Sequence, residues 1–328
     1  MTKKILHTFW DFNINPISFD IIWFLCAADH YSNQNGYDSF MVHFIPEKNE
    51  EQREYPKEFD EVVDIESRRF RKRNICYQSL FLFRRCKDFI VYSDYQKAIN
   101  EKKKLTNVFP KSNVFYLNEK GETGHWEYFN YVNKNIDFEK NLNCGVNPAE
   151  QGNRYIKKWF SYKKINPEKA VSLTLRQLSF DKDRNNNLEL WLNFADYLLD
   201  NSFIPIIVLD SDRIYEKYDF EQKFICNRDV AFNVELRASL YHNCSQNYFV
   251  SSGPASLAQL NPTCKYVTTN VINKVTDEKN LEFLNNLNGF DIPNQPKFCN
   301  TQQYFYWEKE NLEILKSYFE KFKEKNKS

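Results

Sequence analysis

The chain has 328 residues, a formal net charge of +1, 42% hydrophobic residues and 17% aromatic residues. This content can fill a sizeable core, which excludes an intrinsically disordered chain. Nucleic-acid-binding proteins usually have a clear excess of Lys and Arg, which this chain does not have, so we expect no nucleic-acid partner. The length suits two domains, which we place at residues 1–150 and 151–328.

None of the eight cysteines forms a CxxC pair or stands at metal-ligand spacing with a histidine. We therefore expect reduced, mostly buried thiols and no bound metal. The longest apolar stretch, Ile21–Ala28, is too short to span a bilayer, and polar residues interrupt any signal-peptide pattern before it. These features predict a soluble cytoplasmic protein, with at most a peripheral contact at the inner membrane face.

The first half of the chain predicts alternating strands and helices. Lys4–Trp10 is β-prone, Ser18–Tyr31 is an apolar helix, and Ser39–Ile45 resumes as a strand. Together they make a βαβ unit with parallel strands. The pattern beyond is weaker, and its candidates are a charged loop at 47–61, helices at 74–84 and 94–104, strands at 88–92 and 113–117, and an irregular stretch at 123–153.

A second series of strands and helices begins after Asn166-Pro167. Its predicted strands are 170–175, 203–209, 248–250 and 265–268, the last of which closes the set, and its helices are 187–201, 234–243 and 254–260. A helix at 153–163 precedes the series at the domain junction. We expect the last helix, 307–322, to return towards the N-terminal domain. Two such series predict an α/β fold of two Rossmann-like domains facing a cleft.

The most informative segment is residues 247–258, with the sequence NYFVSSGPASLA. An apolar strand runs into two serines and a glycine, and Pro254 stands where a helix would begin, a position that needs no N–H donor. Gly253 lets the backbone approach a ligand, and the free amides of the new helix would face an anion. The segment predicts a diphosphate site, and the alternative is an ordinary strand-to-helix turn with a serine cap. The residues of this site are Ser251, Ser252, Gly253, Pro254, Ala255 and Ser256.

Two arginines follow the predicted strand 170–175. Arg176 comes just past its C-terminal end, which is the edge where ligands bind in open α/β sheets. Guanidinium groups stay charged and grip phosphate oxygens in two places, so we expect Arg176 to bind the diphosphate. Arg184 either does the same or is a solvated loop charge.

The next strand ends at Asp210 and Asp212, separated by one serine. An Asp-x-Asp pair after a strand is typical of a metal clamp for a diphosphate. It can equally contact a ribose or a base, or cap the following turn. We favour a nucleotide contact without a metal.

Taken in order, residues 173–177, 209–212 and 251–258 resemble the donor-binding half of GT-B-fold glycosyltransferases. Residues 252–258 resemble the Ser-Gly-Pro-x-x-Leu-Ala loop of the ADP-heptose-dependent heptosyltransferases. Arg176 and the 210–212 turn resemble elements of the fucosyltransferase-like branch, with Thr174 and Gln177 in place of that motif's histidine and second arginine. The resemblance covers about residues 168–270.

This resemblance implies an enzyme of cell-surface polysaccharide synthesis that moves a hexosyl, fucosyl or heptosyl group from a nucleotide-sugar to a glycan or lipid-linked acceptor. The nucleotide-sugar is a co-substrate, and no cofactor or metal is required. The alternative is a non-catalytic nucleotide- or sugar-phosphate-binding protein of the same fold.

The implied reaction is an inverting displacement at the anomeric carbon. Arg176 and the loop amides stabilise the leaving nucleotide diphosphate. Asp11, in the loop after the first strand, is our candidate for the base that deprotonates the acceptor, with Asn13 and Asn15 on the acceptor side. Weaker candidates for the base are His7 and Asp94.

The only strongly basic stretch is Arg68–Arg73, with the sequence RRFRKR. Such a run is usually a solvated face. Alternatively it meets anionic lipid headgroups or a phosphorylated acceptor, which predicts a peripheral membrane contact through these residues.

Overall fold

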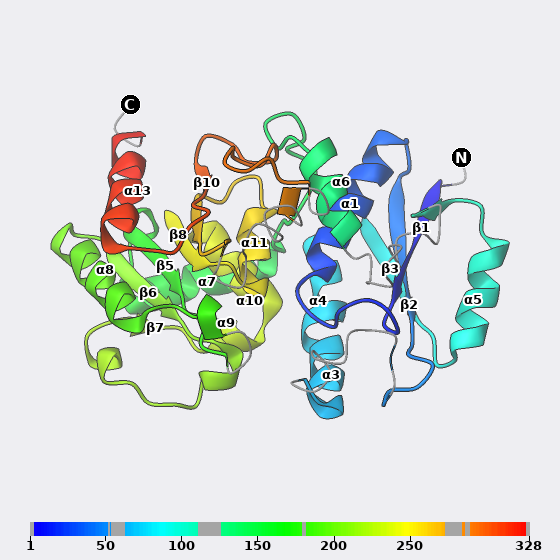
Figure 1. Cartoon of the computed structure of the whole chain (residues 1–328), viewed down its shortest axis with the longest axis horizontal. Helices are drawn as coiled ribbons and strands as arrows, with labels where there is room; N and C mark the ends of the chain where they lie inside the picture. The colour runs from blue at the N-terminus through cyan, green and yellow to red at the C-terminus, as the bar shows by residue number, and fades with distance from the viewer. Residues whose placement is uncertain are drawn as a thin grey trace.

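The computed structural model describes residues 3–51, 53, 63–110, 126–178, 182–272, 284–285 and 289–325. Two halves lie side by side, and each is built around one parallel sheet (Figure 1). The strand order is β3-β2-β1-β4 in the N-terminal sheet and β10-β9-β8-β5-β6-β7 in the C-terminal sheet. This arrangement confirms the expected α/β fold with two Rossmann-like units.

The N-terminal sheet opens with the predicted βαβ unit. β1 (Ile5–Asp11) and β2 (Ser39–Ile45) pair in parallel along their whole length, and α1 (Ile21–Gln34) is the crossover between them. β3 (Cys86–Val91) pairs with β2, and the short β4 (Val108–Phe109) pairs with β1. The strand predicted at 113–117 lies outside the described residues.

The helix predicted at 74–84 is longer than expected. It runs without a break from α3 (Ile65–Arg71) through a π-helical segment (Lys72–Cys76) and α4 (Tyr77–Ser79) to a 3₁₀ turn (Leu80–Leu82). The first part was missed because its density of charge is typical of a solvated loop. The Asp64 side chain caps it by accepting a hydrogen bond from the Ser67 amide at 2.7 Å.

Two other helices complete this half. α5 (Tyr95–Lys104) is the predicted helix at 94–104, and the Asp94 side chain caps it through the Lys97 amide. α6 (Trp126–Asn135) forms where we expected an irregular stretch, which corrects that prediction. Tyr128 and Val132, four residues apart, are buried in the core, and the helix packs on α1. Tertiary packing therefore decides this element.

The C-terminal sheet has the six-stranded order of a doubly wound fold, which reverses direction between β5 and β8. The predictions missed its two outer strands because runs of two and three residues are too short to show alternation. β10 also corrects the expectation that the strand at 265–268 closes the set. The strands are β5 (Ala170–Thr174), β6 (Ile204–Val208), β7 (Ile225–Cys226), β8 (Gln246–Val250), β9 (Tyr266–Thr269) and β10 (Gln303–Phe305).

The helices predicted at 153–163, 187–201 and 234–243 form as expected, the last helix begins at Leu312 and not at 307, and the short α9 was not predicted. α10 occupies a central place, because it packs against α7, α9 and α11 and also against α4 of the N-terminal half. The helices are α7 (Glu150–Lys163), α8 (Leu188–Asp200), α9 (Asp229–Phe232), α10 (Val234–Asn243), α11 (Ser256–Gln259) and α13 (Leu312–Lys325).

The C-terminal helix does not return towards the N-terminal half as expected. α13 packs on α8, at the far left of the molecule in Figure 1. Its apolar face, formed by Leu315, Phe319 and Phe322, is buried in the core between α8 and the C-terminal sheet. Because that surface of the sheet would otherwise be open, the helix is held within its own half.

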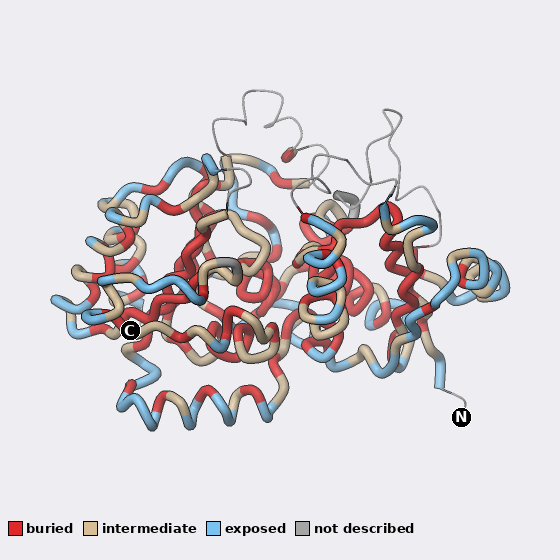
Figure 2. The backbone as a smooth tube through the Cα atoms, turned by 90° about the horizontal axis from the view of Figure 1, so that it is seen from below, coloured by how far each residue is buried: buried red, intermediate tan, exposed pale blue. Residues whose placement is uncertain are grey.

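The largest hydrophobic core continues from one half into the other, since it contains residues of both sheets, such as Trp10 and Phe249. Figure 2 shows buried strands at the centre of both halves and the mostly exposed α5 at the outer edge. All eight cysteines are free, and most are buried, as expected. Within the described residues, no helix combines the length and the hydropathy needed to cross a membrane.

Candidate functional site

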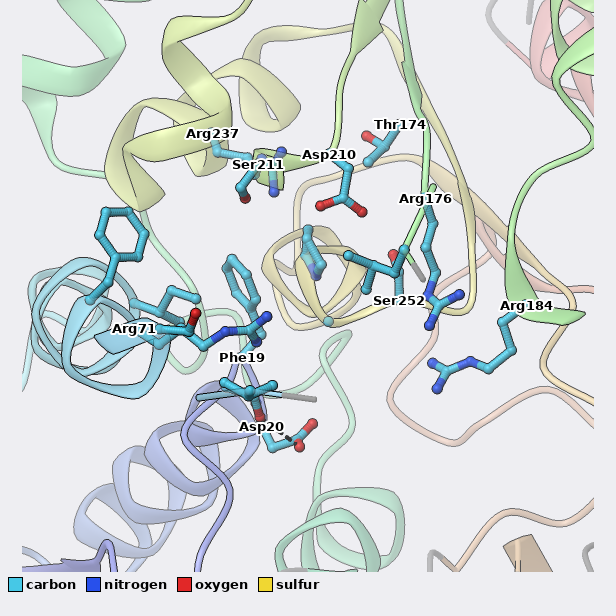
Figure 3. A pocket seen from close by; sticks show the side chains of 18 of the residues that line it. Phe19, Asp20, Arg71, Thr174, Arg176, Arg184, Asp210, Ser211, Arg237 and Ser252 are labelled. Carbon is cyan, nitrogen blue, oxygen red and sulfur yellow. Dashed lines mark hydrogen bonds between the residues drawn. The ribbon is translucent and has the colours of Figure 1, made fainter. Parts of the chain in front are cut away.

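A cavity of about 520 Å³ lies between the two halves (Figure 3). This volume falls within the roughly 300–1,000 Å³ of small-molecule sites. One wall comes from the carboxyl ends of the C-terminal strands, at the point where the strand order reverses, and the other from the starts of α1 and α3. In open α/β sheets this reversal leaves a crevice in which ligands bind.

Arg176 lines the cavity, as the sequence predicts, directly after β5. It is 5% exposed, and its Nη1 donates to Asn185 Oδ1 at 2.6 Å. Asn186 holds the same segment, because its side chain accepts from the Arg176 amide and its own amide donates to the Arg176 carbonyl at 3.2 Å. Asn186 therefore holds the backbone of Arg176, and Asn185 contacts its guanidinium group.

Arg184 also lines the cavity. Its Nη2 donates to the Ser251 carbonyl at 2.8 Å, so it ties the loop after β5 to the end of β8. This contact distinguishes it from a solvated loop charge. Ser251, which we expected to bind the diphosphate, does not line the cavity, and its amide donates to Thr269 O at 2.8 Å.

The turn after β8 is tighter than the predicted helix. Ser252, Gly253 and Pro254 line the cavity, whereas Ala255 and Ser256 are buried beneath them. The turn is a 3₁₀ segment (Gly253–Ala255) followed by the four residues of α11, so little helix dipole is available and the arginines carry the positive charge. Ser252 does not cap this turn, and its buried Oγ has no hydrogen-bond partner among the described residues.

Gly253 is needed for a reason other than the one we expected. A Cβ at this position would lie 3.1 Å from Cβ and Cδ2 of Phe19, which also lines the cavity. The glycine therefore lets the C-terminal turn approach the N-terminal half, whereas we expected it to let the backbone approach a ligand.

Asp210 lines the cavity at the end of β6, and its Oδ2 accepts from the Gln177 amide at 3.4 Å. Asp212 lies in the 3₁₀ turn Ser211–Arg213, and the structure does not describe its side chain. Among the described residues, no three Asp, Glu, His or Cys side chains gather as a metal ion would require.

The predicted acceptor-side residues do not reach the cavity. Asp11, Asn13 and Asn15 are at most 6% exposed, and the Asp11 carboxylate accepts the Asn13 amide within its own turn. His7 pairs with His43 inside the N-terminal half, and Asp94 caps α5. None of these side chains is placed to meet a substrate in this cavity.

Asp20 takes the place that we assigned to Asp11. It stands at the start of α1, lines the cavity, and its Oδ2 accepts the Ser18 hydroxyl at 2.8 Å. A sequence signal was present, because the N-cap residue of the helix that follows a parallel strand lies at the same sheet edge as the end of that strand.

A buried arginine was also missed. Arg237, in α10, is 1% exposed and lines the cavity. The signal was its place on the apolar face of the helix, four residues before Tyr241. Burial raises the pKa of Tyr241, and its hydroxyl group contacts the cavity-lining Thr174 Oγ1 at 2.9 Å.

The basic run 68–73 is not one continuous face. Arg68 is buried and donates to the carbonyls of Val63 and Glu50, while Arg69 and Lys72 form ion pairs with nearby glutamates. Arg71 and the neighbouring Phe70 line the cavity, and Arg71 is the one basic residue of the run that does so. Membrane contact through this segment stays a prediction.

No protein-family model matches the chain, and no curated protein matches its sequence. Its fold has counterparts among solved structures. A family 9 glycosyl transferase from Veillonella parvula DSM 2008 aligns with a TM-score of 0.51 at 11% identity, covering 81% of this chain and 80% of that chain. E. coli ADP-heptose lps heptosyltransferase II gives a TM-score of 0.49 at 9% identity over 99% of this chain and 100% of that chain.

E. coli heptosyltransferase WaaC with ADP gives a TM-score of 0.44 at 10% identity, covering 98% of this chain and 100% of that chain. The V. parvula structure shows that the chain shares its fold with a glycosyltransferase. The fold expected from the sequence, with two Rossmann-like halves, is therefore one that a solved glycosyltransferase structure also has.

Proposed function

We propose that this chain is a glycosyltransferase that moves a sugar from a nucleotide-sugar donor to a glycan or lipid-linked acceptor. One observation carries the proposal. Arg176 and the turn at Ser252–Pro254, which are far apart in the sequence, meet in one cavity at the reversal point of the C-terminal sheet. That cavity is also closed by the N-terminal half, which gives a second substrate a place opposite the first.

The charge of the C-terminal wall suits a diphosphate. It carries Arg176, Arg184 and Arg237 against the single carboxylate of Asp210. Guanidinium groups at fixed positions stabilise the charge that develops on a leaving diphosphate, and they do so without reorganising during the reaction. In metal-dependent transferases a divalent cation neutralises the leaving diphosphate. The fixed arginines can do the same here, so we propose a metal-independent reaction.

Asp20 is the proposed base on the opposite wall. It takes the proton from the acceptor hydroxyl while the acceptor oxygen forms a bond to the anomeric carbon. The bond from that carbon to the diphosphate breaks in the same step, and the arginine wall receives the leaving group. Displacement from the face opposite the leaving group inverts the configuration of the sugar.

A nucleotide screen tests the donor site. Thermal unfolding with GDP, UDP, ADP and CMP should show an upward shift of the midpoint for one of them, because ligands that bind the folded state stabilise it. Arg176→Ala should abolish this shift, whereas Arg154→Ala, on the exposed face of α7, should leave it unchanged. No shift with any nucleotide, or a shift that survives Arg176→Ala, would contradict the proposed site.

Release of the nucleotide from its sugar conjugate in the presence of acceptor mixtures then separates an enzyme from a binding protein. We expect release that persists in excess EDTA. Binding without any release would favour the non-catalytic alternative, and release abolished by EDTA would contradict the metal-independent mechanism.

A further inference from the structure

A buried cation in the wall of the cavity lacks the partners that a structural arginine would have. Arg237 is 1% exposed, and its Nη2 donates to the Leu209 carbonyl at 3.0 Å. Its Nε is buried without a hydrogen-bond partner, and no ion pair joins its side chain to a carboxylate among the described residues. A guanidinium group stays protonated even when buried, so a full positive charge lies here with little compensation.

Such a charge is costly in the free protein. Buried ions are ordinarily paired or fully hydrogen-bonded, and a well-packed apolar side chain of similar volume is often at least as stable. α10 offers an apolar surrounding, since Val234, Ala238 and Tyr241 on the same face are buried. Packing alone would favour leucine or methionine at position 237.

A second group in the cavity wall lacks a partner as well. The Ser252 hydroxyl, on the turn after β8, is buried without a hydrogen bond among the described residues. Ser252 and Arg237 come from different elements, and both can donate. Each of the two groups therefore suits a hydrogen-bond acceptor, and the charge of Arg237 favours an anion.

We infer that Arg237 is an anion-contacting residue of this cavity, which binds a phosphate oxygen of the nucleotide diphosphate from the side of β6 and α10. This inference rests on the proposed function and adds a binding residue to it. In Figure 3 the side chain lies by Ser211 and Asp210, in line with its bond to Leu209, and apart from the labelled Arg176 and Arg184. The diphosphate would therefore be held from two directions.

If the inference is right, replacing Arg237 should change the stability of the free protein and its affinity for the nucleotide in opposite directions. Arg237→Met removes an unpaired buried charge, so its unfolding midpoint without ligand should equal or exceed that of the wild type. The same variant should bind the nucleoside diphosphate that stabilises the wild type at least tenfold more weakly by calorimetry. Arg237→Lys, which keeps the charge but has fewer donors, should lose affinity to an intermediate degree.

The control is Arg154→Met on the exposed face of α7, which should change neither quantity. Inorganic pyrophosphate, added as a competitor, should displace the nucleotide from the wild type more effectively than from Arg237→Met. A variant Arg237→Met that is less stable than the wild type without ligand would make the guanidinium a structural group and overturn the inference.

Unchanged nucleotide affinity in Arg237→Met, with affinity lost in Arg176→Ala, would overturn the inference and leave the proposed function intact. A wild type that binds none of GDP, UDP, ADP and CMP would overturn both. The two failures are therefore distinguishable.

Discussion

At the scale of single residues, the two walls of the cavity differ in their charge. The C-terminal wall carries three arginines and one carboxylate, and the N-terminal wall adds Arg71, Asp20 and Glu66. Glu66 is held by an ion pair with Arg69 at 2.7 Å, whereas the Asp20 carboxylate accepts only the neutral Ser18 hydroxyl among the bonds of the described residues. Asp20 is therefore the carboxylate of this wall that no ion pair among the described residues occupies.

Asp20→Asn should therefore lower kcat by about 10²- to 10⁴-fold, because the amide cannot take up the acceptor proton. The affinity for the nucleotide should stay within about twofold of the wild type, since the arginines are untouched. Steady-state kinetics and calorimetry measure the two quantities, with Asp200→Asn at the end of α8 as the control. A retained kcat would exclude Asp20 as the base and leave Glu66 as the candidate on that wall.

Asn185 is a positioning residue whose effect is also open to measurement. Its Oδ1 accepts from Arg176 Nη1 at 2.6 Å and from the Leu178 amide at 3.1 Å. Asn185→Ala should weaken nucleotide binding by roughly tenfold through misdirection of Arg176, equivalent to about 1.4 kcal/mol. Asn185→Asp should also weaken binding, because its carboxylate neutralises Arg176 and cannot donate to the Leu178 carbonyl, which accepts from Asn185 Nδ2 at 2.8 Å. Unchanged nucleotide affinity in Asn185→Ala would argue against a positioning role.

At the scale of elements, the connection between the halves depends on one glycine. Gly145 has a φ of +92°, and a Cβ there would lie 2.4 Å from the Leu260 carbonyl oxygen. Its amide donates to Asp29 Oδ2 at 3.1 Å, which ties the connection to α1. The connection is therefore packed between α1 and the end of α11, and the backbone there cannot accept a side chain.

Gly145→Ala should destabilise the protein by roughly 3 kcal/mol or more, because it adds a clash with the backbone to an unfavourable φ. Gly36 is the matched control, since its φ is +65° but nothing lies within 4 Å of an added Cβ. Gly36→Ala should cost only about 1–2 kcal/mol. Urea unfolding of the two variants measures the difference, and equal costs would show that the connection can shift to make room.

At the scale of the whole molecule, two buried groups give opposite pH dependences of stability. Burial raises the pKa of Asp29 to about 6, and Arg85 nearby opposes this effect. Burial lowers the pKa of His43 to about 4, and its Nδ1 lies 2.9 Å from the Tyr92 hydroxyl. The contribution of Asp29 is fully present below about pH 4 and is lost as the pH rises through about 6, whereas that of His43 is present above about pH 6.5 and is lost as the pH falls through about 4.

The two effects should largely offset each other in the wild type between about pH 4 and 6.5. Asp29→Asn should make the free energy of unfolding fall more steeply on acidification across this range. His43→Asn should make it fall less steeply on acidification than in the wild type, with each change on the order of 2–3 kcal/mol. Urea unfolding at several pH values tests this, and parallel curves for all three proteins would contradict the assignment.

Local patterns in the sequence were sufficient for most elements of the fold. The strand predicted at 39–45 and the helices predicted at 187–201 and 234–243 are the same elements in the structure, within one or two residues. These signals are local because a strand or a helix is specified by neighbours within a few residues. The order of motifs on successive strands was likewise sufficient to bring Arg176 and Ser252–Pro254 to one sheet edge, because parallel strands place their carboxyl ends together.

Only the tertiary structure decided which polar residues reach the cavity from the other elements. Asp11 ends β1 and Asp20 precedes the next helix, yet the Asp11 carboxylate accepts the Asn13 amide within its own turn whereas Asp20 lines the cavity. The sequence shows Arg237 only as one charge in a helix, and its burial follows from the packing of α10 against helices of both halves. The sequence likewise leaves open which half α13 covers, and the packing of its apolar face on α8 decides this. The physical reason is common to all three. The direction of a side chain or of a helix face is set by contacts between segments far apart in the chain, and the spacing of residues within one segment does not contain that information.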